Sequence, residues 1–419
     1  MCAFNRLDNG ELGVDGMPLS QIAADHDSPL YVYSGASIRD AYRDFAAAVA
    51  PVNGKVHFAM KANSALGILA LLAREGAGAD IVSGGELSRA LAAGMPASDV
   101  VFSGVGKSRS EIEQALVANI GQINAESPAE VAVISAVAAS MGVVAPVALR
   151  VNVDVDAKTH AKISTGQRDT KFGISTDQNE AANLYRVMAD DPHIEPSGLA
   201  VHIGSQLRDM APFETAYTAL LALGSALRAD GLDVPLLDLG GGVGVDYDHA
   251  SPTDFTAYGA MVKRIFDKAG FKLGFEPGRS IVANSGILLT KVIFIKDGDN
   301  KRFIIVDAAM NDLLRPTLYE AHHTIIPVKA PGPDVGMADI VGPVCETGDY
   351  IGRDRMMPEL ASDDLLAVLS AGAYGAVMAS AYNTRPPAGE VLVLDGQVHE
   401  LRAKRSVESY LAEESIPVF

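Results

Sequence analysis

Short apolar runs alternate with amphipathic stretches from residue 37 to about residue 280, and this alternation limits the possible folds more than any other feature. Eight runs have the length and composition of strands, and a helical pattern at 37–50 precedes the first. Strands that alternate with helices pair in parallel, because each helical crossover returns the chain to the end of the sheet at which the previous strand began. The predicted strands are 56–61, 79–84, 100–104, 122–126, 147–153, 198–204, 236–242 and 272–277.

Eight strand–helix units in about 240 residues fit an α/β fold of the (β/α)8 TIM-barrel type, which we expect over residues 36–282. A doubly wound open sheet is the alternative with the same alternation. From residue 283 on, apolar runs are separated by Pro, Gly and Asp turns with few helical patterns, which predicts a mostly β second domain over 283–419. Residues 1–35 contain the strand-like run LYVYS, and we expect them to join that second domain.

Charge and cysteine content exclude several classes of partner. The chain carries 34 Lys and Arg against 52 Asp and Glu, a net charge of −18 that opposes the phosphate contacts of nucleic-acid binding. No apolar stretch of about 18 residues is free of charges and breakers, so we expect no spanning helix and no membrane partner. With only Cys2 and Cys345, and an N-terminus that lacks the apolar segment of a secretion signal, the chain is expected to be cytoplasmic.

Polar and glycine residues gather where the predicted strands end, which is where barrel enzymes place their active sites. Lys61 ends the first strand, where desolvation would favour a neutral amine that can attack a carbonyl group. An ion pair with Asp80 is the alternative for this lysine. His202 would either stack on a flat ring or satisfy a buried hydrogen bond. The whole set comprises Lys61, Asp80, Ser83, Gly84, Gly85, Arg150, Asn152, His202, Ser205, Gly240, Gly241, Gly242, Glu276, Pro277, Gly278 and Arg279.

Two glycine-containing segments predict a phosphate site. DLGGGVG (238–244) and EPGR (276–279) follow the seventh and eighth predicted strands, where barrels bind phosphate through backbone N–H groups. A tight turn is the alternative for the first segment. Glu276 could keep a ring nitrogen protonated, as a pyridine electron sink requires, or could pair with Arg279. An amine, a phosphate cradle and a carboxylate at one rim together predict pyridoxal phosphate.

Several motifs resemble, in order and spacing, those of the diaminopimelate decarboxylases. This family belongs to the fold-type-III pyridoxal phosphate enzymes, with ornithine and arginine decarboxylases and, more distantly, alanine racemase. The resemblance covers residues 25–415 and implies an alanine racemase-like barrel, the cofactor pyridoxal 5'-phosphate, and decarboxylation of meso-2,6-diaminopimelate to L-lysine and CO2, the last step of lysine biosynthesis. The motifs are FAMKAN, GADIVSGGEL, RVNVDVDAKTHAKISTG with KFG, HIGSQ, DLGGGVG, EPGR, RPTLY, GPVCETGD, AGAYG and YNTRP.

The resemblance also implies roles for single residues. Lys61 resembles the Schiff-base lysine, His202 the residue stacked on the cofactor ring, and Glu276 the partner of the pyridine nitrogen. Asp80 and Arg150 resemble groups that support the lysine and the ring. No metal ion is implied. The phosphate site would comprise Ser205, Gly240, Gly241, Gly242 and Gly278. The substrate site would comprise Arg279, Arg315, Tyr319, Glu346 and Tyr374. Pro277, Arg279 and Tyr374 would also lie at the cofactor.

Cys345 resembles the proton donor, and the resemblance implies a homodimer in which Cys345 and Glu346 complete the partner's site. The residue types agree, since two arginines can bind a carboxylate and Glu346 an ammonium group. Surface ion pairs are the alternative for these charged residues. A buried structural cysteine is the alternative for Cys345.

Three other functions remain open at this stage. Decarboxylases of ornithine, arginine or a carboxylated polyamine act on substrates without the distal carboxylate, and they tend to place Asp where this chain has Glu346. Racemases of the related branch pair the ring nitrogen with arginine rather than with a glutamate. A catalytically dead regulator on the same fold would have lost cofactor residues. His160, Lys171 and the loop 329–339 have no assigned role.

Overall fold

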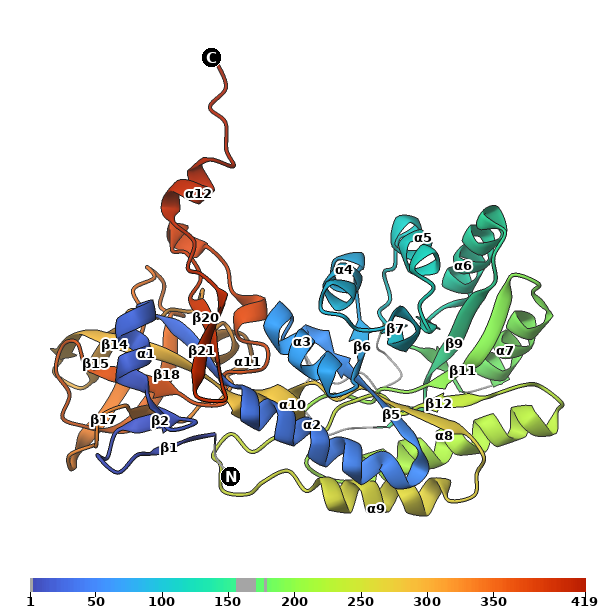
Figure 1. Ribbon diagram of the computed structural model, residues 1–419, viewed down its shortest axis with the longest axis horizontal. Coiled ribbons are helices and arrows are strands. Elements are labelled where there is room, and N and C mark those ends of the chain that lie inside the picture. The colour runs from blue at the N-terminus through green and yellow to red at the C-terminus, as the bar shows by residue number, and fades with distance from the viewer. Residues whose placement is uncertain (1–2, 156–170, 177–178) are drawn as a thin grey trace. The chain divides into compact units, whose positions relative to one another are not determined.

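The computed structural model describes residues 3–155, 171–176 and 179–419, and the chain divides into two compact units (Figure 1). His160 and Cys2 lie outside the described residues. The barrel unit comprises Asp40–Val245 and Thr253–Ser280; the sheet unit comprises Met1–Arg39, Asp246–Pro252 and Ile281–Phe419.

The segment Asp246–Pro252 lies inside the predicted range 36–282 but belongs to the sheet unit. Its bonds explain this placement. The hydroxyl of Thr324 donates to the carbonyl of Tyr247 at 3.2 Å, and the hydroxyl of Ser370 lies 2.9 Å from Nε2 of His249.

The barrel unit contains a closed barrel of eight parallel strands, as predicted. β13 pairs with β5 and β8 pairs with β9, which closes the sheet on itself, so the open doubly wound sheet is excluded. The two-residue strand β10 (Ile174–Ser175) adds to β9. The barrel strands are β5 (Gly54–Ala59), β6 (Gly78–Ile81), β7 (Val100–Phe102), β8 (Gln122–Ala125), β9 (Ala145–Asn152), β11 (Ile194–Ala200), β12 (Leu236–Asp238) and β13 (Lys272–Phe275).

One helix precedes the first barrel strand, others follow the strands along the chain, and helices lie around the barrel strands (Figure 1). Three of them begin at a serine whose hydroxyl accepts a backbone N–H of the first turn, namely Ser83, Ser108 and Ser127. The helices are α2 (Gly35–Val49), α3 (Leu66–Arg74), α4 (Gly84–Ala92), α5 (Arg109–Ala118), α6 (Pro128–Met141), α7 (Glu180–Asp190), α8 (Ala211–Ala229), α9 (Phe255–Phe266) and α10 (Arg279–Val282).

A cluster of aromatic side chains packs α2, α8 and α9 against β13. Phe45 lies 6.0 Å from Phe275 and 5.7 Å from Tyr258 between ring centroids, and the hydroxyls of Tyr217 and Tyr258 are 2.8 Å apart. Burial of such large side chains stabilises a fold by roughly 1.5–3 kcal/mol each. Because Glu276 follows Phe275 directly, this packing also fixes the start of a predicted site segment.

The sheet unit is built on a nine-stranded sheet with the order β18-β17-β15-β14-β4-β20-β21, to which β19 and β16 are attached. β4 comes from the N-terminal segment and pairs with β14 and β20, so this segment joins the mostly β domain, as predicted. A three-stranded sheet shares a buried apolar cluster with the large sheet. Its strands are β1 (Phe4–Arg6), β2 (Leu12–Val14) and β3 (Met17–Pro18); the large sheet comprises β4 (Leu30–Ser34), β14 (Gly286–Asp297), β15 (Arg302–Val306), β16 (Ile325–Pro327), β17 (Asp334–Val341), β18 (Tyr350–Pro358), β19 (Leu365–Val368), β20 (Gly389–Leu394) and β21 (Gln397–Arg402).

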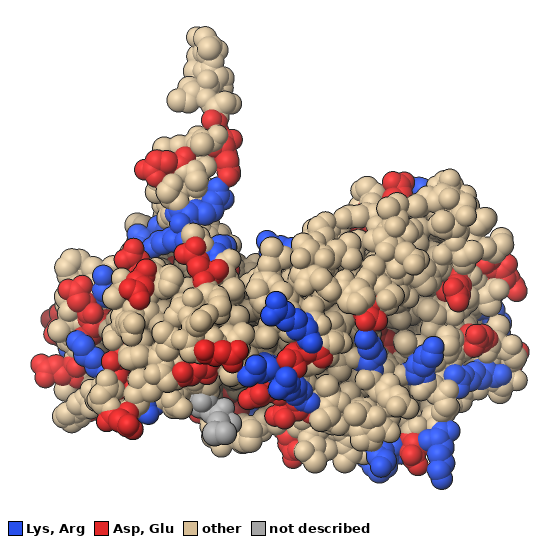
Figure 2. All heavy atoms as spheres, in the orientation of Figure 1, with Lys and Arg blue, Asp and Glu red and all other residues tan. Residues whose placement is uncertain are grey.

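The remaining helices of the sheet unit are short: α1 (Leu19–His26), α11 (Arg315–Tyr319) and α12 (Val407–Leu411). Across the described ranges, no helix is both long and apolar enough to cross a lipid bilayer. On the face shown in Figure 2, acidic and basic side chains are interspersed.

Candidate active site

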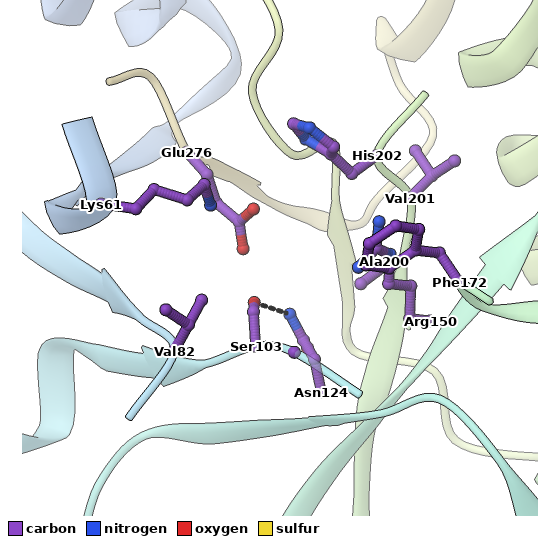
Figure 3. A pocket seen from close by; sticks show the side chains of 11 residues that line it. Lys61, Val82, Ser103, Asn124, Arg150, Phe172, Ala200, Val201, His202 and Glu276 are labelled. Atoms are coloured by element: carbon purple, nitrogen blue, oxygen red, sulfur yellow. Dashed lines mark hydrogen bonds between the residues drawn. The ribbon is translucent and has the colours of Figure 1, made fainter. Parts of the chain in front are cut away.

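A cavity opens at the carboxyl ends of the barrel strands (Figure 3). Lys61 and Glu276 point into it from one side, and Arg150 and Phe172 lie on the opposite side. Ser103 and Asn124 line it between them, with the Asn124 amide donating to the Ser103 hydroxyl at 3.0 Å. The lining residues are Lys61, Val82, Ser103, Gly104, Asn124, Arg150, Phe172, Ala200, Val201, His202 and Glu276.

Lys61 follows β5 in a short 3-10 turn, and its amine meets a buried carboxylate. The amine donates to Oδ2 of Asp80 at 2.6 Å, and Asp80 at the carboxyl side of β6 is fully buried. About a third of the lysine side chain stays exposed toward the cavity. The ion pair that the sequence offered as an alternative is therefore present, and it holds the amine at the rim.

Glu276 follows β13 and shares a hydrogen bond with Asp238, the last residue of β12. Burial, and then the carboxylates of Asp238 and Asp80, raise the pKa of Glu276 well above its ordinary value. Asp238 accepts the N–H of Gly240 at 3.0 Å and the amide of Gln122 at 3.2 Å. Since Asp238 already accepts these donors, Glu276 carries the shared proton and donates it to Asp238.

The other oxygen of Glu276 has a different environment. Oε1 is buried and has no hydrogen-bond partner among the described residues. A buried polar atom without a partner costs about 1–3 kcal/mol, so such an atom at a cavity wall indicates a ligand that supplies the missing donor.

The glycine run Gly240–Gly242 lies against the backbone that follows β11 and β13. A Cβ on Gly241 would lie 2.2 Å from the Glu276 carbonyl oxygen, and one on Gly242 would lie 2.5 Å from that of Gly204. The Gly241 N–H donates to Nδ1 of His202 at 3.2 Å. Burial, with the nearby cations Arg150 and Lys61, holds the pKa of His202 well below its ordinary value, so the ring is neutral and its Nδ1 can accept.

Arg150, on β9, is buried and is held by two contacts. Its guanidinium donates to Glu126 at 2.9 Å and lies 4.9 Å from the centre of the Phe172 ring. Glu126 also accepts the backbone N–H groups of Gly104 and Gly173, each at 3.1 Å. These bonds tie together the loops that follow β7 and β9.

Ser205 and Arg279 lie together, because the Arg279 guanidinium donates to the Ser205 hydroxyl at 3.0 Å. Gly278 packs closely on the Lys61 segment, since a Cβ there would lie 3.0 Å from the Cβ atoms of Ala59 and Ala62. The carbonyl of Pro277 accepts the Ala59 N–H at 3.0 Å. The EPGR segment and the Lys61 segment are thus held in one arrangement.

The other predicted residues belong to the sheet unit. Arg315 begins α11 and is buried, with its guanidinium 3.0 Å from His323 Nε2 and 4.9 Å from the Tyr247 ring centre. Tyr319 ends the same helix. Tyr374 is partly buried and has a left-handed backbone, with φ of 56°.

Cys345 is exposed, which contradicts the interpretation of it as a buried structural cysteine. It lies in a loop shaped by Asp349, whose carboxylate accepts the N–H groups of Val344 at 2.6 Å and Met310 at 2.7 Å. The neighbouring Glu346 is also exposed and accepts the Tyr382 hydroxyl at 3.2 Å. A loop folded around a buried aspartate therefore presents a thiol and a carboxylate to solvent.

Sequence reasoning missed several residues that the structure places at these sites, and it gave no role to Lys171 or the loop 329–339. Lys171 lies 5.3 Å from the Phe172 ring, and part of 329–339 forms β17. A sequence signal existed for Glu126, which ends the predicted strand 122–126, and for Asp238, which lies in the predicted strand 236–242 just before the glycine run. The missed residues are Phe172, Glu126, Asp238, His323, Tyr247 and Asp349.

The chain is similar to known pyridoxal-dependent decarboxylases. The family model "pyridoxal-dependent decarboxylase, pyridoxal binding domain" matches residues 35–283. The diaminopimelate decarboxylase of Zymomonas mobilis is 49% identical over 97% of this chain and 97% of its own length, and that of Vibrio cholerae is 46% identical over 99% of each.

Solved structures agree with the sequence comparisons. Helicobacter pylori diaminopimelate decarboxylase complexed with L-lysine superposes with a TM-score of 0.90 at 40% identity, covering 94% of this chain and 99% of that one. The M. jannaschii enzyme in complex with L-lysine gives a TM-score of 0.92 at 34% identity over 99% and 98%. The chain belongs to the diaminopimelate decarboxylase family of pyridoxal-dependent decarboxylases.

Proposed function

We propose that this protein decarboxylates meso-2,6-diaminopimelate to L-lysine and CO2, the last step of lysine biosynthesis, with pyridoxal 5'-phosphate as its cofactor. The observation that carries the proposal is the rim of the barrel, where Lys61 and Glu276 face one cavity with Asp80 behind the amine. Relatives at 46–49% identity over nearly the whole chain carry the name of this activity.

The residues at the rim fit the cofactor. Lys61 supplies an amine for its aldehyde, and the unpartnered Oε1 of Glu276 can accept an N–H from its ring nitrogen. The glycine run allows close approach to a phosphate, which Ser205 and Gly278 would also contact. The neutral ring of His202 offers a flat face for stacking. When bound, the cofactor acts as an electron sink that stabilises the negative charge left on carbon as CO2 departs.

The chain's own groups prepare this chemistry. Asp80 keeps the Lys61 amine at the cavity rim through the 2.6 Å ion pair. Because the Glu276 proton is donated to Asp238, Oε1 remains an acceptor that would take an N–H from the ring nitrogen of the cofactor. Glu126 fixes Arg150 beside the ring site. Each support is buried, so the groups are held in place before the substrate arrives.

The substrate has two carboxylates and two ammonium groups, one pair at each end. We assign Arg279 and Arg315 to its carboxylates, Glu346 to a distal ammonium group, and Tyr319 and Tyr374 to the walls of the site. The Cys345 thiol would donate its proton to the carbon from which CO2 has left. The exposure of Cys345 and Glu346 supports a homodimer in which they complete the site of the partner.

One assay tests the function directly. The purified protein, supplied with pyridoxal phosphate, is offered meso-diaminopimelate, ornithine and arginine in parallel, and CO2 release is measured. We expect kcat/KM for meso-diaminopimelate to exceed the others by about 100-fold or more, because a site built for the distal carboxylate is left with unpaired cations by the other two. Faster CO2 release from ornithine or arginine would contradict the proposal that meso-diaminopimelate is the substrate. No release from any of the three would indicate a catalytically dead regulator.

A further inference from the structure

A buried histidine in the sheet unit contacts Arg315 and has no place in the function described so far. His323 is fully buried, and both of its ring nitrogens have partners. Nε2 lies 3.0 Å from a terminal nitrogen of Arg315, and Nδ1 lies 2.8 Å from the carbonyl oxygen of Leu369.

These two partners determine the protonation of the ring. A carbonyl oxygen can only accept, so Nδ1 must carry the hydrogen that it donates to Leu369. A guanidinium can only donate, so Nε2 must be the acceptor for Arg315. His323 is therefore the neutral imidazole with its hydrogen on Nδ1.

The backbone fixes this ring in position. His323 stands just before β16, which pairs antiparallel with β19 through Ile325 and Val368. The N–H of Leu369 donates to the Thr324 carbonyl at 2.8 Å, while the Leu369 carbonyl accepts from the His323 ring. The imidazole is thus anchored to the end of a strand pair and cannot follow a displaced arginine.

Tyr247 gives the guanidinium a second contact. The guanidinium carbon of Arg315 lies 4.9 Å from the centre of the Tyr247 ring, and that ring meets the His323 ring edge-on at 5.3 Å. The hydroxyl of Thr324, next to His323, holds the Tyr247 backbone at 3.2 Å. His323 and Tyr247 therefore contact the Arg315 guanidinium on two adjoining sides.

The kind of acceptor matters for a carboxylate-binding arginine. A carboxylate partner would orient Arg315 but would also cancel its charge, whereas a neutral imidazole orients it and leaves the full positive charge. The hydrogen bond to His323 uses one of the five N–H groups of the guanidinium.

We propose that neutral His323, together with Tyr247, positions Arg315 to bind the substrate carboxylate that is retained in L-lysine. The inference rests on the proposed function. His323 is a positioning residue, because it acts through Arg315 rather than on the reacting atoms.

Two substitutions of His323 test its two hydrogen bonds separately. In His323→Asn the amide can still donate to the Leu369 carbonyl, but the acceptor for Arg315 is lost. In His323→Gln the longer side chain can place its carbonyl oxygen near the position of Nε2 and accept from Arg315. His322→Asn is the matched control, because His322 is the exposed neighbour and pairs with Asp248 at 3.0 Å.

The probes are L-lysine and 1,5-diaminopentane, which has the two amines of lysine without the carboxylate. Both are measured as inhibitors of meso-diaminopimelate decarboxylation by the cofactor-loaded protein. We expect His323→Asn to raise the inhibition constant of L-lysine and the KM for the substrate about tenfold, with kcat changed far less, since a lost hydrogen bond to a charged group costs that much. His323→Gln should recover most of the affinity for L-lysine, and inhibition by the diamine should change less than about twofold in every variant.

Tyr247→Leu extends the test to a variant that keeps the His323 bonds, with Tyr247→Phe as its control because the ring is retained. Weaker binding of L-lysine but not of the diamine by Tyr247→Leu would support the inference even if His323→Asn failed to fold. Equal weakening of both probes, or unchanged binding of L-lysine in folded His323→Asn and Tyr247→Leu, would overturn it. An inactive wild-type protein would instead refute the proposed function, and this inference with it.

Discussion

At the scale of single residues, the site holds an electrostatic conflict, the repulsion between buried carboxyl groups. Asp80, Asp238 and Glu276 are all buried, and burial, followed by the charges of Asp238 and Asp80, raises the pKa of Glu276. Lys61 offsets part of this repulsion. Three carboxyl groups buried together destabilise a fold. A cofactor whose ring nitrogen donates to Glu276 would supply the partner that Oε1 lacks.

Glu276→Gln tests this conflict through the pH dependence of stability. Because the pKa of Glu276 is raised on folding, the folded protein keeps a proton that the unfolded chain loses, and the stability of the cofactor-free wild type falls as pH rises above about 4.5 through the raised pKa. Glutamine cannot ionise and can still donate to Asp238. The variant should therefore gain in melting temperature relative to wild type between pH 5 and pH 8, while its kcat falls on the order of 100-fold.

Thermal melts of the two cofactor-free proteins at both pH values measure the effect. Glu113→Gln is the control, because Glu113 lies exposed on α5 and its replacement should leave the pH dependence of the melt unchanged. A Glu276→Gln protein whose melting temperature follows wild type at both pH values would show that Glu276 carries no buried charge conflict.

Residues that contact a ligand were easier to predict from the sequence than residues that position other side chains. Lys61, His202 and Glu276 lie near the carboxyl ends of predicted strands and have chemistry of their own, so position and residue type were enough to select them. Glu126 acts through Arg150, and His323 acts through Arg315. Such pairs depend on neighbouring strands and loops, which no local pattern reveals.

At the scale of elements, all eight barrel strands were predicted, and each was predicted too long at the carboxyl end. β11 ends at Ala200 rather than 204, and β12 ends at Asp238 rather than 242. The apolar and glycine-rich pattern continues past these points, yet the backbone leaves the sheet, with φ of 66° at Gly240 and 111° at Gly242. The residues that leave the strands early are those that form the rim of the site.

Gly241→Ala tests the element that follows β12. A Cβ there would lie 2.2 Å from the Glu276 carbonyl oxygen, so the glycine loop or the Glu276 segment must move. We expect a loss of about 1–3 kcal/mol in the free energy of unfolding and a lower affinity for added pyridoxal phosphate.

Gly106→Ala is the control, because a Cβ at Gly106 would meet nothing within 4 Å. Urea unfolding and cofactor titration compare the three proteins. If Gly241→Ala binds the cofactor as tightly as Gly106→Ala does, the glycine run is a turn rather than part of the phosphate site.

At the scale of the whole molecule, the chain combines a barrel that carries the amine with a sheet unit that carries the thiol. Lys61 belongs to the barrel unit and Cys345 to the sheet unit. The division at 36–282 remains our proposal for the domain boundary. The exposure of Cys345 is the feature that a complete site must account for, and the proposed homodimer does so.

Mixing two inactive variants tests the shared site. Lys61→Ala and Cys345→Ala homodimers should each be nearly inactive. In a random mixture half of the dimers are mixed, and each has one site with both original residues, so activity should return to about one quarter of wild type. No recovery, with mixed dimers demonstrated by two affinity tags, would place Lys61 and Cys345 in the same chain's site.

The central claim is that the cofactor attaches to Lys61. Borohydride reduction of the cofactor-loaded protein fixes the attachment, and mass spectrometry of the digested peptides then locates the added pyridoxyl group. Lys107, which is buried and paired with Glu130 at 2.8 Å, is an internal control. We predict the label on Lys61 alone. A label on another lysine, or an active protein without any label, would contradict the account.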